Sequence, residues 1–204
     1  MDRFTRTGTW AALVGGLLLA GGAAMSAATT INPFSHQVVT TSFALSATLR
    51  LLGTCLMLWG IVALYLRQGD RAGKLGLVAV VACLFNLVLQ SGWMFSDLFV
   101  APVIAGPAPQ ILDGNDTTRL SVAFMLAWLC NASFALLGVA TWRAHVLPRA
   151  TAAGLLAAGL ITFIPLPFDG PIYEVIIGLA FALAAGATLR RPVTAAVPLV
   201  STAT

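Results

Sequence analysis

Charged residues are scarce in this sequence. They make up 9% of its 204 residues, whereas hydrophobic residues make up 59%. Soluble domains carry roughly 25% charged residues, so this composition excludes an ordinary soluble domain. The net charge of +4 is spread over segment ends and does not indicate nucleic-acid binding. Because one helical crossing of a bilayer needs about 20 apolar residues, the chain has room for about six crossings joined by short loops.

The residue patterns of common enzyme and cofactor classes are also missing. The sequence contains no GxSxG, HExxH, GxxxxGK[ST] or CxxC motif. The histidines His36 and His145 lie outside the apolar segments, so no histidine pair within helices could hold haem. The single lysine, Lys74, lies in a loop, which excludes a retinal Schiff base. The three cysteines fall within apolar segments and are expected to be small, buried thiols. We therefore expect no cofactor, no metal site and no catalytic residues.

Six apolar segments are predicted to be membrane-spanning helices. They cover residues 10–28, 42–66, 75–100, 120–142, 150–164 and 172–189, and residues 192–204 read as a loose tail. The third segment is expected to end before Pro102, and Pro148 is expected to stop the fourth. The whole chain, residues 1–204, is thus predicted to be a single all-α membrane domain, a six-transmembrane-helix bundle.

The basic residues predict the orientation of this bundle. If both termini are cytoplasmic, nine of the 11 basic residues lie on the cytoplasmic side, and only Arg50 and Arg119 lie at the other. Cytoplasmic loops of membrane proteins carry an excess of Lys and Arg, so we predict that the N- and C-termini are both cytoplasmic. The expected location is a bacterial plasma membrane, which the chain crosses several times.

The first segment could be read as a signal peptide, because a basic start precedes its apolar run. A retained helix is favoured, because small residues recur at every fourth position and would let another helix approach closely. The sixth segment shows the same spacing. The predicted packing stripe consists of Ala12, Gly16, Ala20 and Ala24 in the first segment and Gly178, Ala182 and Gly186 in the sixth.

Polar residues form one stripe along the third segment. Asn86, Gln90, Trp93 and Asp97 recur at i, i+4, i+7 and i+11, so their side chains share one helix face. A lipid-facing amide would have no hydrogen-bond partner, so this face should point into protein. Asn131 lies at a similar depth in the fourth segment, and either an Asn86–Asn131 bond or a bond from asparagine to backbone between these two helices would satisfy both side chains. This central pair, Asn86 and Asn131, fits two roles: an interhelical hydrogen bond that holds the helices together (polar glue), or the binding of a solute.

A second polar level lies nearer the outer surface. It consists of Arg50, Gln90, Trp93, Asp97, Arg119 and Glu174. The candidate ligand-binding residues among them are Arg50, Gln90, Trp93, Asp97 and Glu174. Cations and anions at similar depth suggest ion pairing across helices. The functional interpretation is a small outward-facing pocket that binds a ligand. The alternative is anchoring at the lipid headgroups, with the Arg50 side chain extending outward into them.

Residues 142–149, Trp-Arg-Ala-His-Val-Leu-Pro-Arg, end the fourth segment ahead of a helix rich in Ala and Gly. This exit resembles the Arg-x-x-x-Leu-Pro-Arg turn of uncharacterised six-helix membrane proteins that are common in high-GC bacteria. The resemblance implies a six-helix layout, and that family brings no activity or catalytic residue to transfer.

Three functions remain open at this point. The favoured one is a non-catalytic membrane protein that acts through helix contacts, such as an accessory or assembly subunit of a larger complex. Its partners would be the lipid bilayer and another membrane protein or further copies of itself, and not nucleic acid. The alternative is a protein that binds or transports a small solute or lipid through the outer pocket. An intramembrane enzyme comes third, with Asp97 and Glu174 as acid and base.

Overall fold

All elements of the described chain are helical. The computed structural model describes residues 2–114, 125–126, 129–164 and 172–190. The longer helices are α1 (Asp2–Ala28), α3 (Thr41–Gln68), α4 (Gly73–Phe95), α8 (Ala132–Ala144), α9 (Arg149–Ile161) and α10 (Ile172–Arg190). Three short helices are α2 (Phe34–Val38), α5 (Ala101–Ala105) and α6 (Pro109–Asp113). A 3-10 turn at Gly69–Ala72 joins α3 to α4, and a π-helical turn at Ser96–Val100 joins α4 to α5.

Four helices in the described ranges are long and apolar enough to cross a membrane. They are Arg3–Ala28, Thr41–Gln68, Gly73–Ala105 and Ile172–Arg190. The all-α prediction is therefore confirmed, and these helices fit a membrane protein. The predicted fourth segment lies partly outside the described residues, and so does the predicted tail at 192–204. At 13 residues, α9 is about 20 Å long, which is short for a span.

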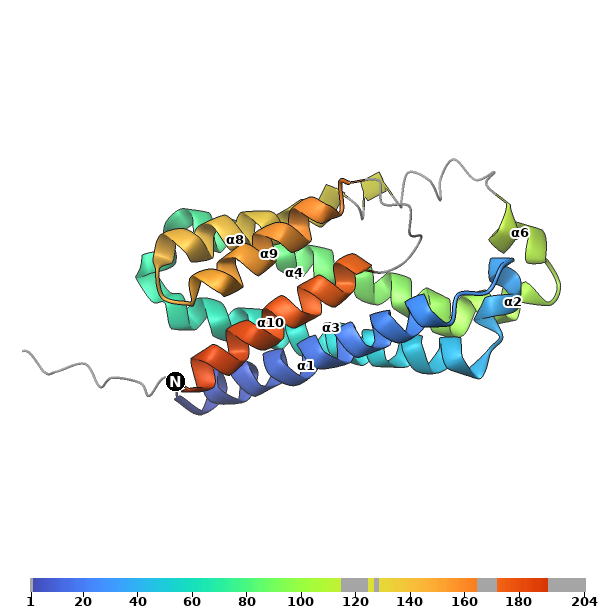
Figure 1. Ribbon diagram of the computed structural model, residues 1–204, viewed down its shortest axis with the longest axis horizontal. Helices are drawn as coiled ribbons and strands as arrows, with labels where there is room; N and C mark the ends of the chain where they lie inside the picture. The colour runs from blue at the N-terminus through green and yellow to red at the C-terminus, as the bar shows by residue number, and fades with distance from the viewer. Residues whose placement is uncertain (1, 115–124, 127–128, 165–171, 191–204) are drawn as a thin grey trace, which may run out of the picture.

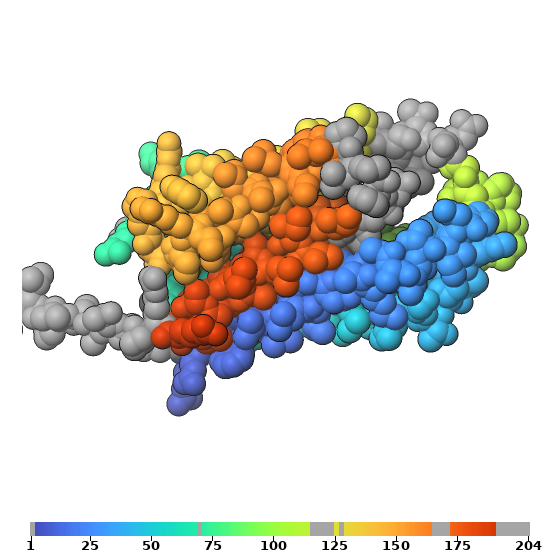
Figure 2. Space-filling model, in the orientation of Figure 1, coloured from blue at the N-terminus to red at the C-terminus, as the bar shows by residue number. Residues whose placement is uncertain are grey.

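The six longer helices follow one another around a closed ring. The order is α1, α3, α4, α8, α9 and α10, and α10 packs back against α1. Figure 1 shows α2 and α6 together at the end of the molecule opposite the N-terminus. In Figure 2, α10 runs along the seam between α1 and α9. The first and last helices of the described chain, α1 and α10, therefore pack against each other and close the ring.

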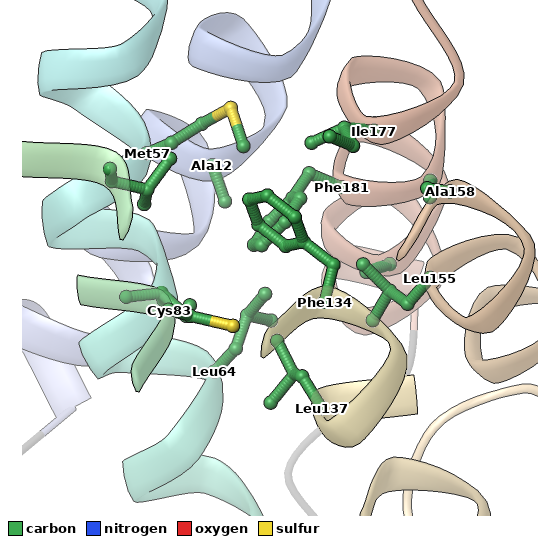
Figure 3. Close-up of a cluster of buried hydrophobic side chains, with 14 of the residues drawn as sticks. Ala12, Met57, Leu64, Cys83, Phe134, Leu137, Leu155, Ala158, Ile177 and Phe181 are labelled. Carbon is green, nitrogen blue, oxygen red and sulfur yellow. The ribbon is translucent and has the colours of Figure 1, made fainter. Parts of the chain in front are cut away.

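Apolar side chains fill the interior of the ring, as Figure 3 shows. Phe134 of α8 and Phe181 of α10 meet edge to face, with ring centroids 6.1 Å apart. Cys83 of α4 is buried among these residues, as expected. The expectation of buried thiols is wrong for the other two cysteines, because Cys55 lies on the outer face of α3 and is exposed, and Cys130 is half-buried. The ring is thus packed as a core and is not an open pore along this stretch.

Glycines spaced seven residues apart on each helix bring α1 and α3 together. They are Gly8, Gly15 and Gly22 on α1, and Gly53 and Gly60 on α3. A Cβ atom on Gly15 would lie 2.7 Å from the Gly53 carbonyl oxygen of α3, and one on Gly53 would lie 2.6 Å from the Leu19 nitrogen of α1. Real Cβ contacts are never this short, so both positions require glycine for the backbones to approach. Close approach through small residues is the usual basis of helix association in lipid.

The predicted small-residue stripes of the first and sixth segments mostly face each other. A side chain on Gly16 would collide with the Gly178 carbonyl oxygen, and one on Gly178 would lie 2.8 Å from the Ala20 nitrogen. Ala182 lies against Gly16, and Ala12 packs instead against Gly60 of α3. The two remaining members are not used in this way. Ala24 is exposed, and Gly186 has no neighbouring atoms within 4 Å of an added Cβ.

The third predicted segment does not end before Pro102. Proline removes one helical hydrogen bond, and its ring crowds the carbonyl four residues earlier. Here the π-helical turn Ser96–Val100 lies just before the proline, and the helix continues to Ala105. The structure also differs from the predicted start of the first segment and from two predicted loops. The first helix begins at Asp2 and not at residue 10, and the predicted loops contain α2 and α6.

Candidate functional site: charged and amide clusters inside the helix ring

A buried ion pair joins α3 to α10. Arg50 Nε donates to Glu174 Oε2 at 2.6 Å, and a second guanidinium nitrogen donates to Glu174 Oε1 at 2.7 Å. Arg50 is 8% exposed and Glu174 is 1% exposed. The expectation that Arg50 extends outward into the headgroups is therefore wrong. A bidentate pair of this kind fixes the position of α3 relative to α10.

The neighbouring helix α1 makes room for the Arg50 side chain. A Cβ atom on Gly22 would lie 2.9 Å from Arg50 Cγ, so only glycine lets the aliphatic part of the arginine pass. On the same helix face, Ser46 Oγ donates to the Gly22 carbonyl oxygen at 3.1 Å. The sequence reasoning missed Gly22. Its seven-residue spacing from Gly15 was the available signal.

A second carboxylate and two aromatic residues complete the charged cluster, which we define as Arg50, Trp93, Asp97, Tyr173 and Glu174. Asp97 is 8% exposed, hydrogen-bonds to the Trp93 side chain and interacts electrostatically with Arg50. Tyr173 Oη donates to Glu174 Oε1 at 3.2 Å. Asp97 lies in the π-helical turn, an irregularity that is frequent at functional sites. The cluster thus holds one guanidinium and two carboxyl groups.

Three amides form a separate cluster, which we call the amide cluster: Asn86, Gln90 and Asn131. Asn131 Oδ1 accepts from Asn86 Nδ2 at 3.0 Å and from Gln90 Nε2 at 2.8 Å. All three side chains are buried. The structure therefore brings Asn86 and Asn131 together as the sequence analysis expected, and it adds Gln90, which had been assigned to the outer level.

Two acceptors of the amide cluster have no partner among the described residues. They are Asn86 Oδ1 and Gln90 Oε1, and both atoms are buried. A buried polar group without a partner costs roughly 1 to 3 kcal/mol. Buried polar groups are nearly always hydrogen-bonded to protein or to ordered water, so these two oxygens are positions where a water or another donor can bind.

Comparisons with protein-family models, with curated proteins and with solved structures found no match. The function of this chain is therefore argued from its own residues.

The predicted outer pocket is divided by these contacts. Gln90 is engaged by Asn131 in the amide cluster, whereas Arg50, Trp93, Asp97 and Glu174 lie together in the charged cluster, and the predicted outer residue Arg119 lies outside the described residues. Tyr173 joins the cluster although the sequence reasoning did not select it. In the parts of the chain that are described, no three His, Cys, Asp or Glu residues are placed to hold a metal ion. An apolar hollow near Gln68 and Thr141 has room for about one water molecule.

A small cap lies beyond the charged cluster, at the end of the molecule that carries α2 and α6. The Ser35 backbone N–H and its hydroxyl donate to Asp113 Oδ1 and Oδ2, at 2.8 Å and 2.6 Å. These two bonds join α2 to α6. They also hold the pKa of the Asp113 carboxyl below its usual range, and nearby His36 acts in the same direction.

Proposed function

We propose that this chain is an integral membrane protein that binds a small polar solute at the charged cluster. The observation that supports this proposal is the burial of Arg50, Asp97 and Glu174 within helices of membrane-spanning length. Ionisable side chains are costly inside a membrane, and they usually mark substrate or ion pathways. A bundle that needed only packing would be as stable or more stable with apolar residues at these positions.

Asp97 is the group in this cluster that is best placed to bind a solute. Arg50 and Glu174 satisfy each other through two hydrogen bonds, whereas Asp97 interacts with the guanidinium only at longer range. One guanidinium beside two carboxylates leaves a net negative charge, which favours a cationic or donor-rich solute. Trp93 provides an aromatic face beside that carboxylate.

The test is to identify small molecules that co-purify with the protein in lipid nanodiscs. We expect mass spectrometry of extracts to find a solute with the wild type that is lost in Asp97→Asn. This change keeps the side-chain shape and leaves the Arg50–Glu174 pair in place. The matched control is Ser91→Ala, because the Ser91 hydroxyl bonds only within α4, to the Leu87 carbonyl at 2.8 Å. Equal retention in both variants, or no solute with the wild type, would refute the proposal.

We also propose six membrane crossings with both termini in the cytoplasm of a bacterial cell. Support comes from the distribution of basic residues and from the place of α8 and α9 in the same ring as the four long helices. Single cysteines at positions 69 and 145 should react with reagents only from the cytoplasmic side. Those at positions 115 and 170 should react only from outside. Labelling of position 115 from the cytoplasm would overturn this topology.

The accessory-subunit hypothesis is a second candidate, and one observation favours it. Ala24 of α1 is exposed, and Gly186 of α10 has open space where a side chain would be. These small residues are not used for packing within the described ring. Replacing both by Leu should lower the recovery of a partner complex in native mass spectrometry, while the isolated protein keeps its thermal stability. Unchanged recovery would remove this candidate.

A further inference from the structure

The cap has an apolar cluster of its own, separate from the main core. Its buried members are Val38, Phe43, Ala47 and Ala101, and Phe34, Leu98, Ala105 and Leu112 pack around them. Phe34 of α2 meets Phe43 of α3 edge to face, with centroids 5.7 Å apart. The main core forms a different cluster, and the α2 and α6 members of the cap cluster, Phe34, Val38 and Leu112, are not part of it.

This apolar cluster lies directly beside the charged cluster. On α3, Ala47 is one helical turn from Arg50, so the two residues share a helix face. On the other side, Leu98 follows Asp97 in the chain, and Ala101 lies four residues after it. The apolar cluster through which α2 packs therefore borders Arg50 on α3 and Asp97 at the end of α4.

A small polar contact adds to this apolar cluster in holding α2 and α6 together. Helix α2 has five residues, and its N-cap residue Pro33 provides no side-chain bond. A helix this short is not stable alone, so it depends on tertiary contacts. The carboxylate of Asp113 takes the place of the missing cap by accepting from both the Ser35 N–H and the Ser35 hydroxyl. Asp113 itself is exposed, so the latch can be broken from the surface.

We propose that α2 and α6 form a lid over the charged cluster and that the Ser35–Asp113 contact is its latch. This inference rests on the proposed solute site, since it assigns the regulation of access to that site. When the latch opens, α2 loses its N-terminal partner and leaves the apolar cluster. The α3–α4 side of Arg50 and Asp97 is then open to water and solute.

The experiment measures the reactivity of a cysteine placed under the lid. Ala101→Cys is introduced after the native cysteines are replaced by Ala, and a charged thiol reagent is applied to the protein in nanodiscs. One net hydrogen bond shifts an opening equilibrium by roughly two- to tenfold, so Asp113→Ala, which removes two, should raise the labelling rate by roughly four- to a hundredfold. Ser35→Ala should raise it less, because the backbone N–H bond remains. The control Gln110→Ala, which changes an exposed side chain of α6, should leave the rate unchanged.

Two measurements separate lid opening from unfolding. A cysteine at Ala180, which is 2% exposed in the main core, should stay unreactive in Asp113→Ala. Hydrogen exchange of the otherwise unmodified Asp113→Ala protein should be faster in α2 and unchanged in α8. An unchanged labelling rate and unchanged exchange in α2 would overturn the lid, and so would loss of protection throughout the ring. If the lid opens as expected but no solute co-purifies with the wild type, the lid stands and the proposed function fails.

Discussion

The Arg50–Glu174 pair allows a quantitative test of how the ring is held together. Replacing Glu174 by Leu leaves a guanidinium that is 8% exposed without its carboxylate partner. Loss of one partner of a buried ion pair costs about 3 to 5 kcal/mol, because the other charge stays buried without compensation. Since domains are stable by about 5 to 15 kcal/mol, this single change should remove a large share of the free energy of unfolding.

The double replacement should behave very differently. With Arg50→Met and Glu174→Leu together, the hydrogen-bonded pair is removed as a whole, and Asp97, which keeps its bond to Trp93, is the one charged group left in the cluster. Apolar replacement of a whole buried pair is often neutral or stabilising. The cost of the double variant should therefore be much smaller than the sum of the two single costs, with a coupling of at least about 3 kcal/mol. The cost of Arg50→Lys should lie between the costs of the double variant and of Glu174→Leu. Lysine keeps the positive charge, but an ammonium cannot reproduce the two parallel bonds of the guanidinium.

The assay is equilibrium unfolding in mixed micelles for the wild type, both single variants and the double variant. Ser91→Ala serves as the control for a polar-to-apolar change in the neighbouring helix. If the costs of the single variants simply add in the double variant, the two side chains are not coupled and the pairing argument is refuted. A double variant that is also unable to bind solute would be consistent with a site built on this pair.

The other predictions concern the helix contacts and the latch. Gly16→Leu should separate α1 from α10 and lower the thermal stability, whereas Gly21→Leu, at a position with open space, should not; equal effects would contradict the packing argument. Asn131→Leu should cost about 1 to 2 kcal/mol of unfolding free energy, since it removes two interhelical bonds, and additivity with Asn86→Leu would show that these two residues are not partners. The latch should weaken on acidification. The pKa of Asp113 is lowered in the folded protein, so its contribution is present above the ordinary pKa of an aspartate and is lost as the pH falls through the folded pKa. The labelling rate of the cysteine under the lid, divided by the rate of a free thiol at the same pH, should therefore rise at low pH, and in Asp113→Asn this ratio should not respond to pH.

The third predicted helix shows how much sequence periodicity can establish. The spacing of Asn86, Gln90, Trp93 and Asp97 was enough to place them on one interior face, because helical geometry alone fixes that relation. It could not tell which partner each side chain takes. Gln90 was grouped with the charged residues by depth, but its amide reaches Asn131 in the structure.

Partners that are distant in the chain explain the larger errors. Arg50 and Glu174 are 124 residues apart, and nothing in the local sequence indicates that Gly22 clears a path between them. Extension into the headgroups was therefore the simpler expectation for Arg50. The short helices α2 and α6 were missed because five residues are too few to show a helical period.

The contact between α1 and α10 also bears on how the protein is made. Among the described helices, α1 is synthesised first and α10 last, yet the two pack against each other through Gly16 and Gly178. During synthesis at about 5 to 20 residues per second, the α10-facing side of α1 therefore waits for roughly ten seconds or longer without its native partner. In that interval lipid or the insertion machinery must cover it. A chain that stops before α10 would leave this face of α1 permanently open and would be a natural substrate for membrane quality control.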